Sequence, residues 1–239
     1  MPKKSFSFII PSFNEEKNLT GTIIEINKVI ARQSINDYEL IIVNDCSFDN
    51  TEYVANQLKK KYKNIRVVNN RSNLGFGGSY KIGVKNATKD YVIMVPGDNA
   101  HPAEGIYPIL RLAGYADIII PYITNNLEAR SLFRRIISRT YTGMVNTLFS
   151  LDVPYYNGCV LHKRHLIQSI TINTDSFAYQ AEGLLRLLKK GHSFIVIGVD
   201  FNERDQGKSS AFNIGNIYKV IKTIIMIKVE FISMRTKNN

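Results

Sequence analysis

Short apolar runs alternate with longer amphipathic stretches along the first hundred residues. The stretches between the runs show the three- and four-residue spacing of apolar positions that is typical of helices. Each run has the length of one buried strand. Three strand–loop–helix units followed by a fourth strand predict an α/β fold with a mainly parallel sheet and right-handed crossovers. The four predicted strands are residues 6–10, 38–43, 65–68 and 91–95.

The pattern is less regular after residue 100. It predicts helices at 128–149 and 177–190, the second ended by Gly191. It also predicts strands at 116–121, 157–161 and 194–201. The tail, residues 214–234, interleaves isoleucines with lysines, which predicts a basic amphipathic helix on an anionic membrane surface. A helix packed on the domain and a homo-oligomer interface are the alternatives.

Charge narrows the choice of partners. The net charge of +11 indicates an anionic partner, either nucleic acid, an acidic membrane surface or a phosphorylated small molecule. We rank nucleic acid low, because the chain has no recognition motif for it. Cys46 and Cys159 are too few for a disulfide framework, and neither a signal peptide nor a membrane-spanning run is present. These features predict a cytoplasmic protein.

Acidic side chains follow three of the predicted strands. Glu15, Asp45 and Asp98 come after the first, second and fourth strands, whose carboxyl ends meet at one sheet edge. Carboxylates there suit hydrogen bonds to a ribose or base and a divalent cation that bridges a pyrophosphate. The alternative is a turn or helix cap, which we favour for Asp49 but not for Asp45.

Two further loops contain glycines or cations. The sequence LGFGG (74–78) lacks the ending of a phosphate-binding P-loop. Its glycines can admit a nucleotide, or let a strand pack closely against a helix. Arg204, Lys208 and Ser209 lie within six residues and can close over a diphosphate, although a solvated loop is an equal alternative.

Three segments together resemble a known family. IIPSFNEE (9–16), VNDCSFDNT (43–51) and the stretch from Asn70 to Asp98 are similar to family 2 inverting glycosyltransferases of the GT-A (Rossmann-like) fold. ERDQGKS (203–209) matches the Arg-x-x-Gly-x-Ser pattern of the polyprenyl-phosphate branch, which includes dolichol-phosphate mannose synthase. The resemblance implies a nucleotide-binding half (1–100), an acceptor half (101–211) and a separate tail (212–239).

The resemblance also implies roles for individual residues. A UDP- or GDP-linked sugar would be the donor, a polyprenyl phosphate the acceptor, and Mg²⁺ or Mn²⁺ the metal, bound by Asp98. Asp98, Arg204 and Lys208 would be catalytic. The donor would contact Pro11, Phe13, Asn14, Glu15, Asp45, Gly75, Pro96, Gly97 and Asn99. The acceptor would contact Arg134, Arg135, Arg139, Asn157, Gln180 and Glu182.

The sequence departs from the family pattern at three places. Pro96 stands where the first aspartate of an Asp-x-Asp motif is expected, and VPYYNGCVLHKR (153–164) replaces the usual acceptor motif. Tyr179 and Gln180 replace the Glu-Asp pair of relatives that glycosylate hydroxyls. A hydroxyl needs a base, whereas a phosphate monoester is ionised at pH 7, so this third departure favours a phosphate acceptor.

Alternatives remain open at this stage. Glu182 can substitute as the base, although an exposed helix residue is the simpler interpretation. The rival functions are transfer to a sugar hydroxyl of a surface polysaccharide and catalytically silent binding of a nucleotide sugar. For the leading function we expect a peripheral enzyme at the inner face of the membrane.

Overall fold

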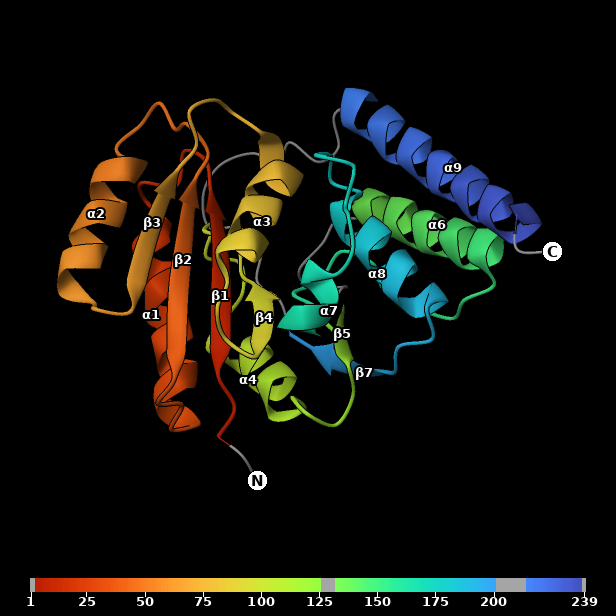
Figure 1. Ribbon diagram of the computed structural model, residues 1–239. Helices are drawn as coiled ribbons and strands as arrows, with labels where there is room; N and C mark the ends of the chain where they lie inside the picture. Colours follow the sequence, from red (N-terminus) through yellow and green to blue (C-terminus); the bar gives the residue numbers. More distant parts are fainter. Residues whose placement is uncertain (1–2, 126–131, 201–213, 238–239) are drawn as a thin grey trace.

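A seven-stranded sheet with helices on both faces forms the centre of the computed structural model, which describes residues 3–125, 132–200 and 214–237 (Figure 1). The strand order is β3-β2-β1-β4-β6-β5-β7, and β6 alone of these strands runs antiparallel to its neighbours. The strands are β1 (Phe6–Ser12), β2 (Tyr38–Asn44), β3 (Ile65–Asn69), β4 (Tyr91–Met94), β5 (Ile118–Ile123), β6 (Leu161–Lys163) and β7 (Phe194–Val199).

Helices fill the connections between these strands. They are α1 (Leu19–Arg32), α2 (Thr51–Lys61), α3 (Gly75–Asn86), α4 (Ala103–Arg111), α6 (Leu132–Phe149), α7 (Arg164–Gln168), α8 (Tyr179–Lys189) and α9 (Ile214–Lys237). The strands and helices predicted for the first hundred residues are confirmed, including the parallel pairing of β1 with β2 and β4.

Alternating side chains of the central strands feed two cores. Ile9 and Ile41 face a core with α3, α6, α8 and α9, whereas Ile10 and Ile42 face a core with α1, α2 and α4. All seven residues of β1 are buried, because both its faces and both its edges are covered. This double burial holds the carboxyl ends of β1, β2 and β4 rigidly at one edge.

The second half differs from the predicted pattern at two strands. The expected strand at 157–161 is wrong, since β6 begins only at Leu161, and residues 157–160 are irregular. Strand β5 continues past Pro121, where the prediction ended it. A proline is tolerated there because β6 pairs only with Ile118 and Ile119, so the rest of β5 is hydrogen-bonded to β7 alone in the described sheet.

The tail forms one long helix, α9, with two apolar faces. Ile224 and Ile227 are buried against the domain, and Phe231 meets Phe149 edge to face at 5.9 Å. The opposite side exposes an apolar stripe with helical spacing: Tyr218, Ile221, Ile225, Val229 and Ile232. The predicted helix is therefore present, but it does not have the predicted division into one apolar and one basic face.

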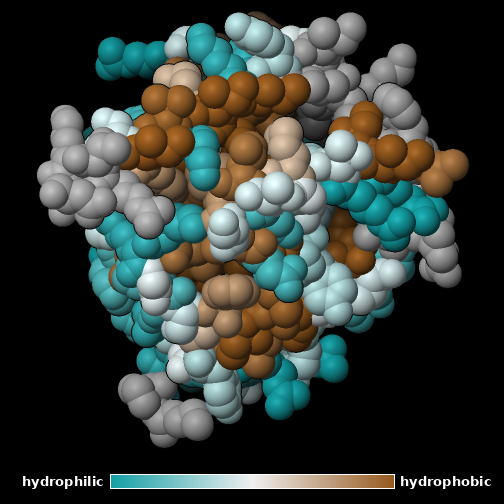
Figure 2. Space-filling model, turned by 90° about the vertical axis from the view of Figure 1, so that its right-hand side faces the viewer, coloured by the Kyte–Doolittle hydropathy of each residue, from teal (hydrophilic) through white to brown (hydrophobic). Residues whose placement is uncertain are grey.

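The apolar stripe contributes to a partly apolar surface. Brown, hydrophobic side chains gather in several patches on the face of the molecule where α6, α8 and α9 lie (Figure 2). Among the described residues, no helix combines the length and apolarity needed to cross a bilayer. The exposed apolar side chains are consequently candidates for contact with a surface rather than for insertion across it.

Candidate active site

A groove of about 1470 Å³ opens at the carboxyl edge of β1, β2 and β4. The three loops predicted to converge all line it, through Pro11–Glu15, Asp45 and Pro96–Asp98. The opposite wall comes from the start of α3, the loop 173–177 and α9. The predicted convergence is confirmed, and the second half of the chain closes the groove.

The loops at this edge have strained backbones. Asn14, Cys46 and Asn99, which follow β1, β2 and β4, have φ angles of +56°, +59° and +59°. Asn14 ties two loops together, because its N–H donates to Ser47 Oγ (3.1 Å) and its Oδ1 accepts from Phe48 N (2.9 Å). Strain of this kind gathers where a fixed loop geometry serves a ligand.

An aromatic pair lies at the mouth of the groove. Phe13 and Phe48 meet edge to face at 5.9 Å, and they are 39% and 84% exposed. Phe13 lines the groove, as predicted for a donor-binding residue, and Phe48 was not predicted. An exposed phenylalanine in the polar loop 44–51 was the signal that sequence reasoning missed. Such rings offer an apolar face for a base.

Asp45 has a structural role that the sequence analysis disfavoured. Its buried carboxylate accepts hydrogen bonds from Leu74 N and Gly75 N, both at 2.9 Å, and from Asn70 Nδ2 at 2.7 Å. A negative charge at the start of α3 also stabilises the helix dipole. Asp49 caps α2 through Thr51 N at 2.9 Å, as predicted.

The glycines of LGFGG admit a neighbouring loop. Gly77 N donates to Asp175 O at 3.1 Å, and a β carbon on Gly77 would lie 2.8 Å from that oxygen. Lys81 fixes the same loop by an ion pair with Asp175 at 2.6 Å. At Gly77, the close approach is therefore made by the backbone of loop 173–177. Gly75, with φ of +76°, lines the groove.

Asp98 projects from the loop after β4 into the groove. Its Oδ1 accepts from Ala100 N at 3.2 Å, so the turn interpretation holds without using both oxygens in this bond. Gly97 cannot carry a side chain, because its β carbon would lie 2.5 Å from Ser12 Oγ. Burial, and then the nearby Asp98 carboxylate, raise the pKa of the Cys159 thiol well above its usual value.

The remaining predicted donor residues fall into two groups. Pro11, Asn14, Glu15 and Pro96 line the groove with Asp98. Asn99 is instead placed against α1, where its N–H donates to Thr22 Oγ1 at 3.0 Å. Arg204 and Lys208 lie outside the residues that the structure describes.

The predicted acceptor residues are not brought together in the groove. Gln180 is buried and donates to Gly158 O, while Asn157 borders a separate cavity of about 160 Å³. Arg135 and Arg139 lie on α6, as does Arg134, whose side chain is outside the described part. None of these five is among the described residues that line the groove.

Glu182 lines the groove but is not the exposed residue of the simpler interpretation, which is wrong. Its side chain is 1% exposed and accepts from Asn173 N (3.1 Å), Thr174 N (3.0 Å) and Arg186 (Nε 3.0 Å, Nη2 2.8 Å). Arg186 also forms two 2.8 Å hydrogen bonds with Glu230. This network joins α8, α9 and the loop 173–177.

Cations from α9 were not predicted as part of the site. Lys219 and Lys222 line the groove opposite the acidic edge, and Thr223 beside them donates to Thr174 Oγ1 at 3.2 Å. The signal was available as lysines three residues apart in the tail, which share one helix face. Lysine ammonium groups are suited to phosphate oxygens.

A divalent cation fits this groove only with help from a ligand. Among the described residues, no group of three His, Cys, Asp or Glu side chains is arranged to hold a metal ion. Mg²⁺ is commonly bound by one or two carboxylates together with substrate phosphates and water. Asp98 can supply the one protein carboxylate for such a shared site.

The fold and the site together define a class of α/β nucleotide-sugar enzymes. Residues 7–170 match the family model "Glycosyl transferase family 2". Since that match covers more than half of the chain, this chain belongs to glycosyl transferase family 2, and the resemblance in its motifs is confirmed.

Curated relatives include two lipid-phosphate glycosyltransferases. The dolichyl-phosphate beta-glucosyltransferase of Trichomonas vaginalis is 33% identical over 103 residues, which cover 41% of this chain and 32% of the relative. The undecaprenyl-phosphate 4-deoxy-4-formamido-L-arabinose transferase of Pectobacterium carotovorum is 28% identical over 170 residues, covering 70% and 51%. The chain thus spans about half or less of these relatives.

Solved structures confirm the predicted GT-A-like fold. Glucosyl-3-phosphoglycerate synthase of Mycobacterium tuberculosis, in complex with phosphoglyceric acid, has a TM-score of 0.69 at 16% identity, covering 93% of this chain and 79% of that chain. The same enzyme with Mn²⁺, UDP and phosphoglyceric acid has a TM-score of 0.66 at 17% identity, covering 94% and 78%.

Proposed function

We propose that this protein transfers a sugar from a nucleotide-diphosphate donor to a polyprenyl phosphate, with inversion at the anomeric carbon. The observation that carries the proposal is the single groove in which the acidic loops of the sheet edge face the lysines of α9. The two curated relatives, which are named for dolichyl-phosphate and undecaprenyl-phosphate substrates, support the choice of acceptor.

The groove residues divide the work by chemistry. Phe13 and Glu15 bind the base and ribose, and Lys219 and Lys222 neutralise phosphate charge. A bound Mg²⁺ or Mn²⁺ would act as a Lewis acid on the diphosphate. Asp98 holds the cation together with the diphosphate oxygens. Mn²⁺ with UDP in the structural neighbour supports this cofactor.

The acceptor needs no protein base. A phosphate oxygen attacks the anomeric carbon, the bond to the diphosphate oxygen breaks, and the nucleoside diphosphate leaves with the electron pair. Phosphate monoesters have a second pKa of about 6 and are nucleophilic at pH 7. The occupied oxygens of Glu182 fit this requirement, because a hydroxyl acceptor would need an available carboxylate.

The place of action follows from the acceptor. A polyprenyl phosphate lies in a membrane, so the enzyme works peripherally, at the inner face where nucleotide sugars are available. The exposed apolar stripe of α9 and the net charge of +11 support contact with an anionic surface. The boundary between nucleotide-binding and acceptor halves near residue 100 remains part of the proposal.

Radiolabelled transfer tests the proposal directly. The protein is incubated with Mn²⁺ and UDP- or GDP-linked sugars, and with either undecaprenyl phosphate or oligosaccharides. We expect label in the lipid fraction, and its loss by at least about a hundredfold in Asp98→Asn, which keeps the turn acceptor but removes the charge. Asp37→Asn, at the opposite sheet edge, is the matched control.

Two results would contradict the proposal. Label in oligosaccharide alone would establish the hydroxyl-acceptor rival. Donor binding without transfer or donor hydrolysis, under every donor and acceptor, would establish a silent nucleotide-sugar-binding protein.

A further inference from the structure

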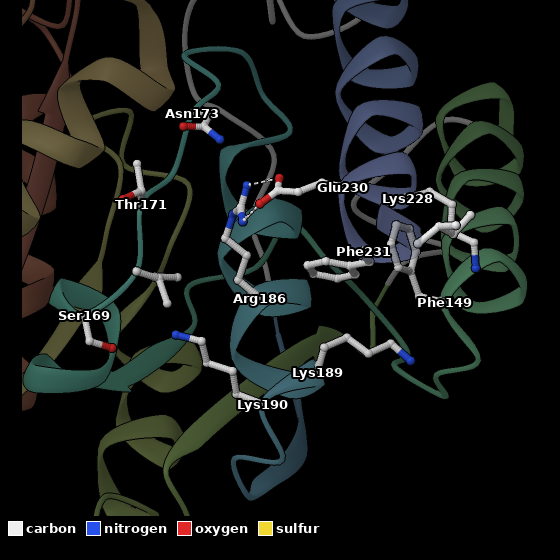
Figure 3. A pocket seen from close by; sticks show the side chains of 12 residues that line it. Phe149, Ser169, Thr171, Asn173, Arg186, Lys189, Lys190, Lys228, Glu230 and Phe231 are labelled. Atoms are coloured by element: carbon white, nitrogen blue, oxygen red, sulfur yellow. Dashed lines mark hydrogen bonds and ion pairs between the residues drawn. The ribbon is translucent and has the colours of Figure 1, made fainter. Parts of the chain in front are cut away.

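A second cavity, of about 620 Å³, lies between the end of α8, the segment 169–173 and α9. It is next to the groove but distinct from its acidic edge, and the two share Asn173, Arg186 and Glu230. The Arg186–Glu230 ion pair, with two 2.8 Å hydrogen bonds, therefore lies on the boundary between the two spaces (Figure 3).

The cavity is cationic on its rim. Lys189 and Lys190 end α8 and are exposed, and Figure 3 shows their side chains leaving the helix toward opposite sides. In the described part of the chain, neither lysine has a carboxylate within ion-pair distance, whereas Arg186 is neutralised by Glu182 and Glu230. Lys228 is a third lysine of the lining.

The lining also contains an apolar surface. Phe149, Ile170, Phe231 and Ile232 line the same space as the lysines. Ile232 is 53% exposed and is also the last member of the apolar stripe of α9. The cavity is therefore continuous with an apolar surface, a combination that suits an amphiphile better than a small soluble anion.

Helix polarity favours the same kind of ligand. Both α7 and α8 end at this cavity, at Gln168 and Lys189, so their carbonyl ends oppose the deep burial of a bare anion. Flexible lysines at the rim, above apolar side chains, instead match the headgroups and acyl chains at a bilayer interface.

We propose that this cavity, with Lys189, Lys190 and Ile232, binds an anionic glycerophospholipid of the bilayer, separately from the acceptor substrate. The bound lipid holds α9 on the membrane surface with the groove beside it. The inference builds on the proposed work at a membrane, but it concerns a lipid that is not consumed.

Vesicle binding tests the inference without requiring sugar transfer. The full chain is titrated with phosphatidylcholine vesicles, with and without phosphatidylglycerol. We expect binding only with phosphatidylglycerol, and a loss of at least about tenfold in affinity for Lys189→Glu with Lys190→Glu. Lys59→Glu with Lys60→Glu is the matched control, because these lysines are also exposed in the last turn of a helix, α2, at the opposite side of the molecule (Figure 1).

The outcomes separate the cavity from general charge. Equal losses in the two double variants, or binding that does not depend on phosphatidylglycerol, would overturn the inference. Release of the protein from vesicles by millimolar glycerol 3-phosphate would identify a soluble phosphoanion as the ligand instead. If the charge-reversed variant fails to fold, Lys190→Gln with Ile232→Asn replaces two exposed side chains and is expected to weaken binding about fivefold.

Failure of this inference differs from failure of the proposed function. A protein that transfers sugar to detergent-solubilised undecaprenyl phosphate but ignores phosphatidylglycerol retains the function and refutes the cavity. A protein that binds these vesicles through Lys189 and Lys190 but transfers nothing does the reverse.

Discussion

Single carboxylates near the groove differ in how far the protein already uses their oxygens. A carboxylate offers about four acceptor positions. Glu182 receives four hydrogen bonds and Asp45 receives three, all from groups that hold the local fold. Asp98 receives one bond from its own turn. Asp98 is therefore the carboxylate best placed to act on a ligand.

Glu182→Gln should destabilise the protein rather than remove a base. Loss of the buried charge leaves Arg186 paired with Glu230 alone, which should lower the free energy of unfolding by about 2–4 kcal/mol. Denaturant unfolding measures this change. The folded fraction should keep kcat within about tenfold of the original protein, since a lost general base costs about 10²-fold or more.

Glu230→Gln is the matched control for that substitution. Glu230 bonds the same arginine but is 33% exposed, so the loss should be about 1 kcal/mol. An unchanged free energy of unfolding in Glu182→Gln, together with a hundredfold lower kcat, would identify Glu182 as the base and revive the hydroxyl acceptor.

At the scale of elements, the first turn of α3 and the loop 173–177 depend on one close contact. Gly77→Ala would place a β carbon 2.8 Å from Asp175 O, which a backbone oxygen cannot yield without moving the loop. We expect a loss of about 1–3 kcal/mol in the free energy of unfolding and weaker UDP binding, because the loop lines the groove.

Gly143→Ala supplies the control for Gly77. Gly143 lies within α6, and a β carbon added there would meet nothing within 4 Å, so alanine should stabilise the protein by about 0.5–1 kcal/mol. Similar stability in both variants would show that the Asp175 contact is unimportant.

Asp117 joins the starts of β5 and β7 to the end of β6. Its Oδ1 accepts from Lys163 Nζ at 2.7 Å, and its Oδ2 accepts from Ser193 N and Oγ, both at 3.0 Å. The Lys163 hydrogen bond, against some desolvation, lowers the pKa of Asp117 from 3.8 to about 2. The carboxylate therefore stabilises the fold above its unfolded pKa, and this contribution is lost as the pH falls toward 2.

Asp117→Asn should accordingly show a pH-dependent loss. At pH 7 we expect a free energy of unfolding lower by about 1–2 kcal/mol, with the gap to the original protein closing between about pH 4 and pH 2. Urea unfolding across this range measures it. Asp37→Asn, which breaks the exposed pair with Lys89, should cost at most about 0.5 kcal/mol, and an equal cost in both would refute the argument.

For the whole molecule, the sequence predicts the first half well because local and global signals agree there. Runs such as YVIMV (91–95) are buried on both faces, and each is followed by a turn that ends it. The run NGCVL (157–161) misled, because its residues are buried as irregular chain and only Leu161 enters the ladder. An apolar run reveals burial, but the kind of structure depends on tertiary contacts.

The site was predictable only where topology alone brings residues together. The loops after β1, β2 and β4 must meet at one edge, so Glu15, Asp45 and Asp98 could be grouped from the sequence. The packing of loop 173–177 on Gly77, and of α9 across the groove, depends on contacts between residues almost 100 or more positions apart. Lys219 and Lys222 were therefore missed.

The composite groove leads to a prediction that concerns both halves of the molecule. Lys219 and Lys222 are exposed and face the nucleotide-binding loops across the groove, so they should contribute to diphosphate binding mainly by charge. Lys219→Gln with Lys222→Gln should weaken binding of UDP with Mn²⁺ about three- to tenfold at low salt, and the difference should shrink at high salt because mobile ions screen it. Calorimetry measures both, with Lys59→Gln with Lys60→Gln as the control. If the groove-lining and control variants bind UDP equally at low salt, then α9 borders the groove without taking part in donor binding, and its lysines must serve the acceptor or the membrane instead.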